Sequence, residues 1–307
     1  MATARLRSTA KLRMCSRWWR IAGAAYLVLL LASHVVDSRR SKHTPSAEMR
    51  YVAVHVVDHG KLGAGTIRLA YRDTDPNSAR IPVVLIHGSP RSSEVLLKLA
   101  DLLSPQFRVL VPDLPGFAAS THELPDYSFR THGRYLIELL DALQVSQAQL
   151  VAFSMGGGVA LSMTDLEPQR VGSLVMLSAI GVQEQELTGS YGVNHVLHGA
   201  QLAALWLLRD WFPHFGLFSR LRFTIEYARN FYDSDQRPLR AILERYRGPM
   251  LILHGIRDLN VPIAAAREHH RLVPQSEIIE FDDDHFMAVM HPSAFVGPLA
   301  DFLARRR

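Results

Sequence analysis

The chain has 307 residues, 48% of them hydrophobic and 21% charged, so it is long enough for one large globular domain or two small ones. Its formal charge of +5 is unevenly distributed, because residues 1–50 hold ten Lys/Arg against two Asp/Glu, whereas the remainder holds 24 against 27. This distribution favours a membrane surface near the N-terminus and argues against nucleic-acid binding. The single cysteine, Cys15, excludes an intramolecular disulfide.

An apolar stretch follows the basic N-terminus. Residues 21–36 are almost wholly apolar and lie between the pair Trp18-Trp19 and the pair Arg39-Arg40. As a helix this stretch rises about 24 Å, slightly less than a bilayer core, but interfacial tryptophans extend the span. We expect a single membrane-spanning helix within residues 1–37. A cleaved secretory signal and a buried or peripheral helix are the alternatives, although no convincing small-x-small cleavage site follows Leu31.

The positive residues on the two sides of this stretch predict its orientation. Six Lys/Arg precede residue 21, and four lie between residues 37 and 50. By the positive-inside rule, this difference places the N-terminus in the cytoplasm and the remaining domain outside it, in the periplasm if the chain is bacterial. Residues 38–50 are polar and include Pro45, and we expect them to form a linker.

The first strand-like segments after the linker are residues 51–57 and 66–71. They flank a stretch that contains Gly60, Gly63 and Gly65, which favours a turn. The pattern predicts an antiparallel pair of strands.

Short apolar runs then alternate with longer amphipathic segments. We expect further strands at residues 81–86, 107–111, 149–153, 173–177, 250–253 and 277–281. Helices are expected at residues 93–103, 129–143, 155–166, 263–272 and 293–304. Buried strands that alternate with helices indicate an α/β fold, in which a mostly parallel sheet is covered on both faces and functional residues follow the carboxyl ends of the strands.

A long segment, residues 182–247, separates two of these strands. Helices are expected in it at residues 195–212, 222–231 and 238–247. It is rich in large apolar side chains, at Trp206, Trp211, Phe212, Phe215, Phe218 and Phe223. These side chains either form the core of a small helical subdomain, roof an apolar pocket at the carboxyl edge of the sheet, or dip into a membrane surface, and the sequence leaves the three alternatives open.

Ser154 follows the apolar run 149–153 and precedes a glycine-rich stretch. This pattern predicts a strand, a tight elbow at the serine and a helix that begins at Met155. Such an elbow requires small residues two positions before and after the serine, and Ala152 and Gly156 meet that requirement. A serine nucleophile also needs a base and donors for an oxyanion, so Ser154 is a candidate nucleophile only with such partners.

Two loops near the C-terminus contain the candidate partners. His285 follows strand 277–281 in an acidic loop, and Asp258 follows strand 250–253 ahead of Pro262. A solvated loop histidine and a helix-capping aspartate are the structural alternatives. The chain order serine, aspartate, histidine is the order found when a triad lies on successive strand ends of one parallel sheet.

The loop His87-Gly88-Ser89-Pro90 follows strand 81–86. Glycine there lets the backbone approach a substrate closely, so the N–H groups of Ser89 and Met155 are the expected oxyanion donors. His87 comes directly after the strand, which favours a structural role over that of a catalytic base. The segment 113–120 is expected to be a structural turn bordering the site.

These motifs resemble the α/β-hydrolase superfamily, in the branch with a helical cap between strands six and seven. The resemblance covers residues 51–304 and rests on five motifs in chain order: His87–Pro90, Asp113–Phe117, Phe153–Gly157, Gly255–Pro262 and Asp284–Phe286. It implies a mostly parallel, eight-stranded sheet, a core of residues 51–181 and 248–307, and a cap of residues 182–247. It also implies a Ser-Asp-His hydrolase that uses no metal or organic cofactor. Two departures from the family pattern are Ala152 in place of glycine and Phe153 in place of histidine or tryptophan.

The resemblance implies hydrolysis of an ester-like bond in a small hydrophobic substrate through an acyl-enzyme on Ser154. One alternative is hydrolysis of a carbon–carbon bond in a dione by the same triad. Another, of a different class, is a ligand-binding or sensor protein with slow turnover. The His-Gly-x-Pro loop also resembles that of epoxide hydrolases and haloalkane dehalogenases, but those enzymes use aspartate where Ser154 stands, which argues against both activities.

Overall fold

The computed structural model describes residues 2–40, 48–217 and 225–305, and within the first helix it describes the side chains of residues 17–39. The chain forms two compact units, one of residues 1–43 and 203–224 and the other of residues 44–202 and 225–307. Part of the expected linker (41–47), the start of one expected helix (222–224), Phe218 and Phe223, and the Cys15 side chain lie outside what is described.

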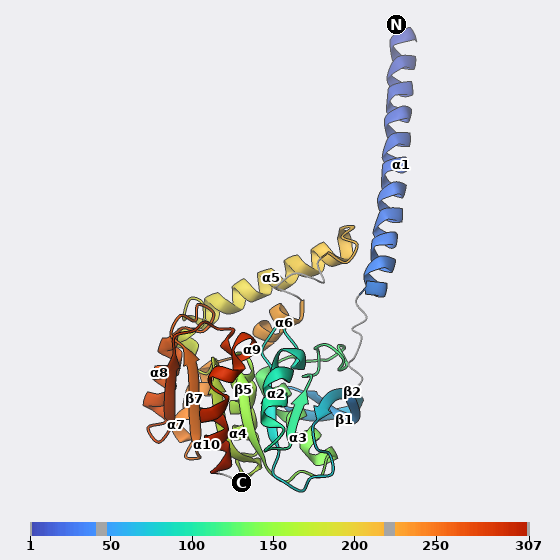
Figure 1. Ribbon diagram of the computed structural model, residues 1–307. Helices are drawn as coiled ribbons and strands as arrows, with labels where there is room; N and C mark the ends of the chain where they lie inside the picture. Colours follow the sequence, from blue (N-terminus) through green and yellow to red (C-terminus); the bar gives the residue numbers. More distant parts are fainter. Residues whose placement is uncertain (1, 41–47, 218–224, 306–307) are drawn as a thin grey trace. The chain divides into compact units, whose positions relative to one another are not determined.

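The larger unit is built on one sheet of eight strands in the order β1-β2-β4-β3-β5-β6-β7-β8 (Figure 1). The strands are β1 (Arg50–Asp58), β2 (Lys61–Asp73), β3 (Val83–Ile86), β4 (Val109–Pro112), β5 (Ala148–Phe153), β6 (Val171–Leu177), β7 (Met250–Gly255) and β8 (Glu277–Phe281). The pairs β1–β2 and β2–β4 are antiparallel, and the pairs from β4 to β8 are parallel. The predicted mostly parallel, eight-stranded α/β sheet is confirmed.

Helices cover both faces of this sheet (Figure 1). The helices between residues 97 and 304 are α2 (Leu97–Leu103), α3 (Phe129–Ala142), α4 (Gly156–Leu166), α5 (Tyr191–Trp211), α6 (Ile225–Asp233), α7 (Arg237–Arg245), α8 (Ile263–Leu272), α9 (Met287–Met290) and α10 (Val296–Ala304). The residues of α5 do not belong to the hydrophobic cores on the two faces. Short 3₁₀ helices span Ser93–Leu96, Pro168–Arg170, Gln183–Gln185 and Pro292–Ala294.

The buried strands explain why two separate cores form. In β5, Leu150 and Ala152 pack with α3 and α4, whereas Val151 and Phe153 point to the opposite face with α2 and α10. Successive side chains of a strand alternate between faces, so a strand that is apolar at every position needs cover on both sides. Each fully buried aliphatic side chain contributes about 1.5–3 kcal/mol, so these layers hold the strand ends, and the loops after them, in place.

Two local expectations were wrong. The hairpin turn is not the wide glycine-containing segment but the two residues His59 and Gly60, both with positive φ (45° and 74°), whereas Gly63 and Gly65 lie inside β2. Two-residue turns with positive φ match the twist of the flanking strands and allow continuous pairing.

The short helix α9 was not predicted, because four residues are too few to show a helical period.

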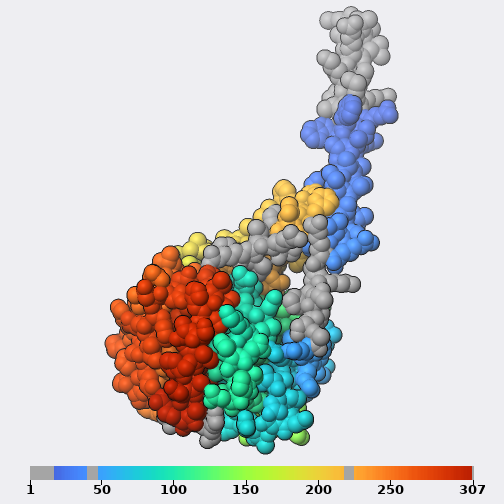
Figure 2. All heavy atoms as spheres, viewed as in Figure 1, coloured from blue at the N-terminus to red at the C-terminus, as the bar shows by residue number. Residues whose placement is uncertain are grey.

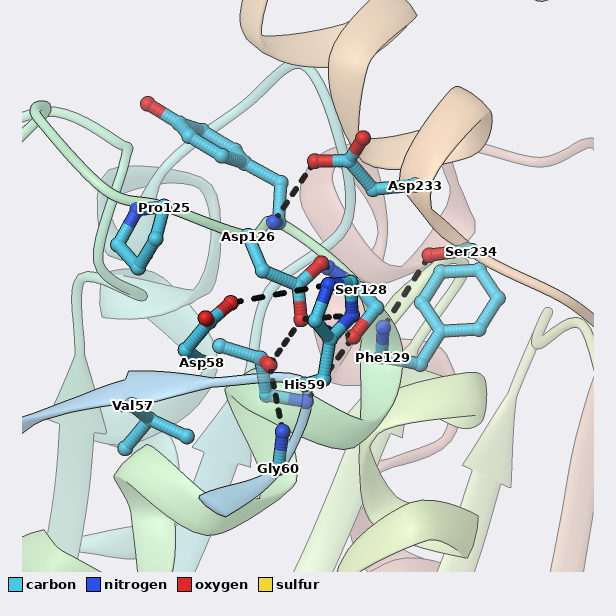
Figure 3. Close-up of polar contacts among 12 residues, drawn as sticks. Val57, Asp58, His59, Gly60, Pro125, Asp126, Ser128, Phe129, Asp233 and Ser234 are labelled. Atoms are coloured by element: carbon cyan, nitrogen blue, oxygen red, sulfur yellow. Dashed lines mark hydrogen bonds and ion pairs between the residues drawn. The ribbon is translucent and has the colours of Figure 1, made fainter. Parts of the chain in front are cut away.

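The insertion between β6 and β7 contains α5, α6 and α7, and polar contacts fix α6 to the segment that precedes α3 (Figure 3). Asp233 accepts a hydrogen bond from the Tyr127 N–H (2.9 Å), and Ser234 Oγ accepts one from the Phe129 N–H (3.1 Å). From the other direction, the Asn230 side-chain amide donates to the Tyr127 carbonyl (2.7 Å). This part of the insertion is therefore tied to the unit that contains the sheet.

The smaller unit contains the long helix α1 (Ala2–Arg40). Its segment Arg17–Arg39 has a mean hydropathy of 1.6, is almost entirely exposed, and is the one helix in the described part of the chain that is long and apolar enough to cross a membrane. A secretory signal near an N-terminus has the same length and composition.

Candidate active site

Ser154 lies at the turn between β5 and α4, where its backbone has φ of 55°. A side chain is rarely held in this left-handed region unless the surrounding structure requires it. The turn is crowded: a Cβ atom added to Gly156 would lie 2.6 Å from the carbonyl oxygen of Ile86, and Ala152 is fully buried. The small residues on either side of Ser154 are therefore sterically required, and alanine satisfies the requirement at position 152. The helix begins at Gly156, one residue later than expected.

His285 lies in the loop between β8 and α9. Its Nε2 is 3.0 Å from Ser154 Oγ, which is hydrogen-bonding distance, although the two residues are 131 positions apart in the chain. The imidazole is almost fully buried, and the ring of Phe153 packs against it with a centroid separation of 5.2 Å. Phe153, which stands where the family often has histidine or tryptophan, thus packs against the imidazole of His285.

Asp258 lies in the loop after β7, and its Oδ2 is 2.7 Å from Nδ1 of His285. Burial alone would raise the pKa of Asp258, but hydrogen bonds from His254, His285 and the Val261 N–H lower it to about 2. The carboxylate is therefore ionised at neutral pH and can only accept hydrogen bonds. It follows that Nδ1 of His285 carries the proton. The other ring nitrogen, Nε2, is then free to accept a hydrogen bond from the Ser154 hydroxyl.

The loop that follows β3 approaches Ser154 closely. A Cβ atom added to Gly88 would lie 2.8 Å from the Cβ of Ser154, so only glycine fits without displacement. The backbone N–H groups of Ser89 and Met155 donate no hydrogen bond to any residue within the described ranges. Both are therefore available as donors on the two loops that flank Ser154.

His87 has the structural position that its sequence context predicts. It is fully buried, its Nε2 accepts a hydrogen bond from the Leu114 N–H (3.0 Å), and burial lowers its pKa. Asp113 likewise caps the neighbouring turn by accepting bonds from the N–H groups of Ser93 (3.0 Å) and Ala119 (3.1 Å). Both side chains stabilise the loops around Ser154.

Comparison with known proteins agrees with this architecture. Residues 81–213 match the family described as alpha/beta hydrolase fold. A solved esterase from Thermogutta terrifontis superposes with a TM-score of 0.66 over 83% of this chain and 98% of the esterase, at 21% identity, which establishes a shared fold. The chain has the α/β-hydrolase fold.

Two curated relatives of this α/β-hydrolase come from Pseudomonas putida. A 2-hydroxymuconate semialdehyde hydrolase is 26% identical over 273 residues, which cover 80% of this chain and 95% of the relative. The dihydrolipoyllysine-residue acetyltransferase component of an acetoin cleaving system is 27% identical over 233 residues, which cover 70% of this chain and 61% of that relative.

Sequence reasoning about this α/β-hydrolase missed His254. This histidine ends β7 fully buried, and its Nε2 lies 2.8 Å from the Val261 carbonyl oxygen and 3.4 Å from Asp258 Oδ2. It thus contacts the same carboxylate oxygen as His285. A spacing of four residues between His254 and Asp258 was the available signal, but with fifteen histidines in the chain it was too weak to single one out.

Metal binding was tested on the same geometry. Within the ranges that the structure describes, no group of three or more His, Cys, Asp and Glu side chains is arranged to hold a metal ion.

Proposed function

We propose that this chain is a serine hydrolase that cleaves an ester-like bond of a small hydrophobic substrate, with Ser154 as nucleophile, His285 as general base and Asp258 as the group that orients His285. One observation carries the proposal. The Ser154 Oγ, His285 and Asp258 side chains form a continuous hydrogen-bonded chain, with distances of 3.0 and 2.7 Å. The three residues come from different loops, and the stability of the fold does not require them to form this hydrogen-bonded chain at the carboxyl edge of the sheet. Nucleophilic catalysis does require it.

The geometry leads to a two-step mechanism. Ser154 Oγ attacks the substrate carbonyl carbon while its proton moves to Nε2 of His285. The resulting oxyanion accepts hydrogen bonds from the N–H groups of Ser89 and Met155, each worth about 3 kcal/mol in a preorganised site. The tetrahedral intermediate expels the leaving group, which takes the proton from His285, and an acyl-enzyme remains. Water then gives its proton to His285 and attacks the acyl carbon. The second tetrahedral intermediate collapses, the acid is released, and His285 returns the proton to Ser154 Oγ.

The segment 182–247 is proposed to act as the cap that selects the substrate, and residues 51–181 and 248–307 as the catalytic core. An insertion between β6 and β7 follows the carboxyl end of a strand next to Ser154, since the Ile180 N–H donates to the Ser154 carbonyl (3.1 Å). Ligands of open α/β sheets bind at this edge.

Hydrolysis of a carbon–carbon bond in a dione is a second candidate. The 2-hydroxymuconate semialdehyde hydrolase noted above, which aligns along 95% of its own length, supports it. Both reactions need the same nucleophile, base and oxyanion donors, so the substrate is what distinguishes them.

A substrate panel distinguishes these reactions. The purified full chain is first labelled with a fluorophosphonate, and then assayed with p-nitrophenyl esters of increasing acyl length and with a vinylogous dione. We expect labelling on Ser154 and turnover of esters in preference to the dione. Preference for the dione would favour the second candidate. Saturable ligand binding without labelling would instead indicate a sensor protein and contradict both hydrolytic candidates.

We further propose that α1 is retained as a single-pass anchor, with the N-terminus in the cytoplasm and the hydrolase core outside it. Support comes from the apolar segment Arg17–Arg39 and from the excess of Lys/Arg ahead of it. In sealed spheroplasts, we expect externally added protease to digest the core while leaving a short α1 fragment in the membrane. Release of an undigested core into the soluble fraction would show that the segment is a cleaved signal.

A further inference from the structure

Helix α5 has an exposed apolar face along its whole length. Its buried residues are Asn194, His198 and Leu202, which recur every four residues. On other sides of the helix, apolar residues recur every three or four positions and are exposed, at Val193, Leu197, Ala200, Ala204, Leu207 and Trp211. Figure 2 shows atoms of this helix, in yellow, at the surface. We name these six residues the α5 stripe.

The composition of α5 differs from that of an ordinary surface helix. Residues 191–208 include no Asp, Glu, Lys or Arg. A helix that faces water normally has charged residues on its exposed side. In the α5 stripe, Leu197, Leu207 and Trp211 are 49%, 54% and 63% exposed. A helix whose first 18 residues carry no charge and whose only charged residues, Arg209 and Asp210, lie in its last turn suits an apolar environment along most of its length, and its tryptophans suit a membrane interface.

The turn after α5 belongs to the same compact unit as α1. A side chain of α1 accepts hydrogen bonds from two backbone N–H groups of this turn. The hydroxyl of Ser33 accepts hydrogen bonds from the N–H groups of His214 (2.8 Å) and Phe215 (2.7 Å). The next two N–H groups are also paired, Gly216 with Nδ1 of His214 (3.1 Å) and Leu217 with the His214 carbonyl (2.9 Å). Non-helical backbone in hydrocarbon requires this pairing, because water is absent there.

The position of Ser33 on α1 gives the depth of this turn. Ser33 lies six residues before Arg39, the end of the apolar segment, which corresponds to about 9 Å along the helix. Tyr26, further into the segment, donates to the carbonyl of Trp211. If Arg17–Arg39 crosses a bilayer, His214 and Phe215 lie in the leaflet nearer Arg39, and Trp211, which contacts Tyr26 thirteen residues before Arg39, lies near the middle of the span.

We infer that the α5 stripe and the turn after it are a second membrane-contact surface, which enters the lipid interface beside α1. This inference rests on the proposed retention of α1 as an anchor. We assign a lipid bilayer as the partner because the α5 stripe and the turn after it are apolar and uncharged, and because this turn contacts α1. The hydrolase then has its substrate-selecting segment in contact with lipid, which favours acyl substrates that partition into the bilayer.

Tryptophan fluorescence tests this inference in the full chain. The variant Trp18→Phe/Trp19→Phe retains Trp206 and Trp211, and it is reconstituted in vesicles of phosphatidylcholine and phosphatidylglycerol. We expect lipids brominated on the acyl chain to quench most of the emission, and aqueous acrylamide to quench little of it. Adding Leu197→Glu/Leu207→Glu should reduce the quenching by brominated lipid several-fold, whereas the matched exposed substitution Leu102→Glu should not.

Two further chains make the result interpretable. A chain with Trp19 as its sole tryptophan reports on insertion of α1, and one with only Leu102→Trp reports on an exposed site of the core. Quenching of Trp19 by brominated lipid, combined with acrylamide quenching of Trp206 and Trp211, would overturn the inference while leaving the anchor intact. Disulfide cross-linking of two chains at Leu197→Cys, in a Cys15→Ser background, would assign the stripe to a second copy and also overturn it. Fluorophosphonate labelling in the same vesicles reports separately on the proposed catalytic function.

Discussion

Replacement of Ser154 by alanine is expected to abolish ester hydrolysis, with kcat falling by about 10⁶-fold. The reason is that covalent catalysis is lost completely: no other hydroxyl in the described ranges lies within hydrogen-bonding distance of His285 Nε2. The measurement is turnover of a p-nitrophenyl ester at saturating substrate, together with fluorophosphonate labelling. Residual hydrolysis should reflect only substrate binding and the oxyanion donors.

The control for this change is Ser104→Ala, which removes an exposed hydroxyl from the end of α2. It should leave turnover unchanged. Both variants should unfold at nearly the same temperature as the parent chain, because each loses one described side-chain hydrogen bond, that of Ser154 Oγ with His285 or that of Ser104 Oγ with the Asp101 carbonyl. If Ser154→Ala retained ester turnover or fluorophosphonate labelling, another residue would have to be the nucleophile.

Replacement of Asp258 by asparagine is expected to lower kcat by about 10⁴-fold while leaving the fold intact. The carboxylate accepts a hydrogen bond from the Nδ1–H of His285, so the opposite nitrogen can accept the serine proton. An amide donates where the carboxylate accepts, which favours the wrong imidazole tautomer. The measurement is kcat/KM for the preferred ester. Asp282→Asn, an exposed change ahead of His285, is the matched control.

The same substitution should change the response of the protein to acid. The folded-state pKa of Asp258, about 2, lies below its ordinary value of 3.8, so the folded chain binds this proton less tightly than the unfolded chain. The corresponding stability is present above about pH 4 and is lost as pH falls through about 2. At 1.36 kcal/mol per unit of pKa, the gap is worth roughly 2 kcal/mol. Asp258→Asn should lack this part of the acid dependence in urea unfolding at pH 2 to 5, and an unchanged profile would contradict the assignment.

Much of the fold was predictable because the strands are buried on both faces. The run at β3 is apolar at every position and the run at β5 at every position but Gln149, and the segments between the strands have helical periods, so the α/β class follows from pattern alone. The glycines of β2 were less informative. Glycine marks both turns and strand positions, and the short turn at His59 and Gly60 depends on pairing with β1.

Of the membrane-related features, one was predictable from the sequence and the others required the structure. The apolar segment of α1 is evident in the sequence, because its length and composition are local properties. That Ser33 would bond the turn at His214 and Phe215 was not predictable, since the partners are 181 and 182 residues apart. The exposure of the α5 stripe likewise depends on which face of the helix the rest of the protein covers.

By itself the sequence determined the fold class and placed Ser154, Asp258 and His285 after the ends of three parallel strands, β5, β7 and β8. Motif spacing and chain order are sufficient for that, because parallel strands bring their carboxyl ends to one edge of the sheet. Only the tertiary structure decided the distances of 3.0 and 2.7 Å that join the three side chains, the packing of Phe153 on His285 and the support of Asp258 by His254. These contacts join residues from separate loops, and their geometry is set by the packing of the whole sheet rather than by any local pattern.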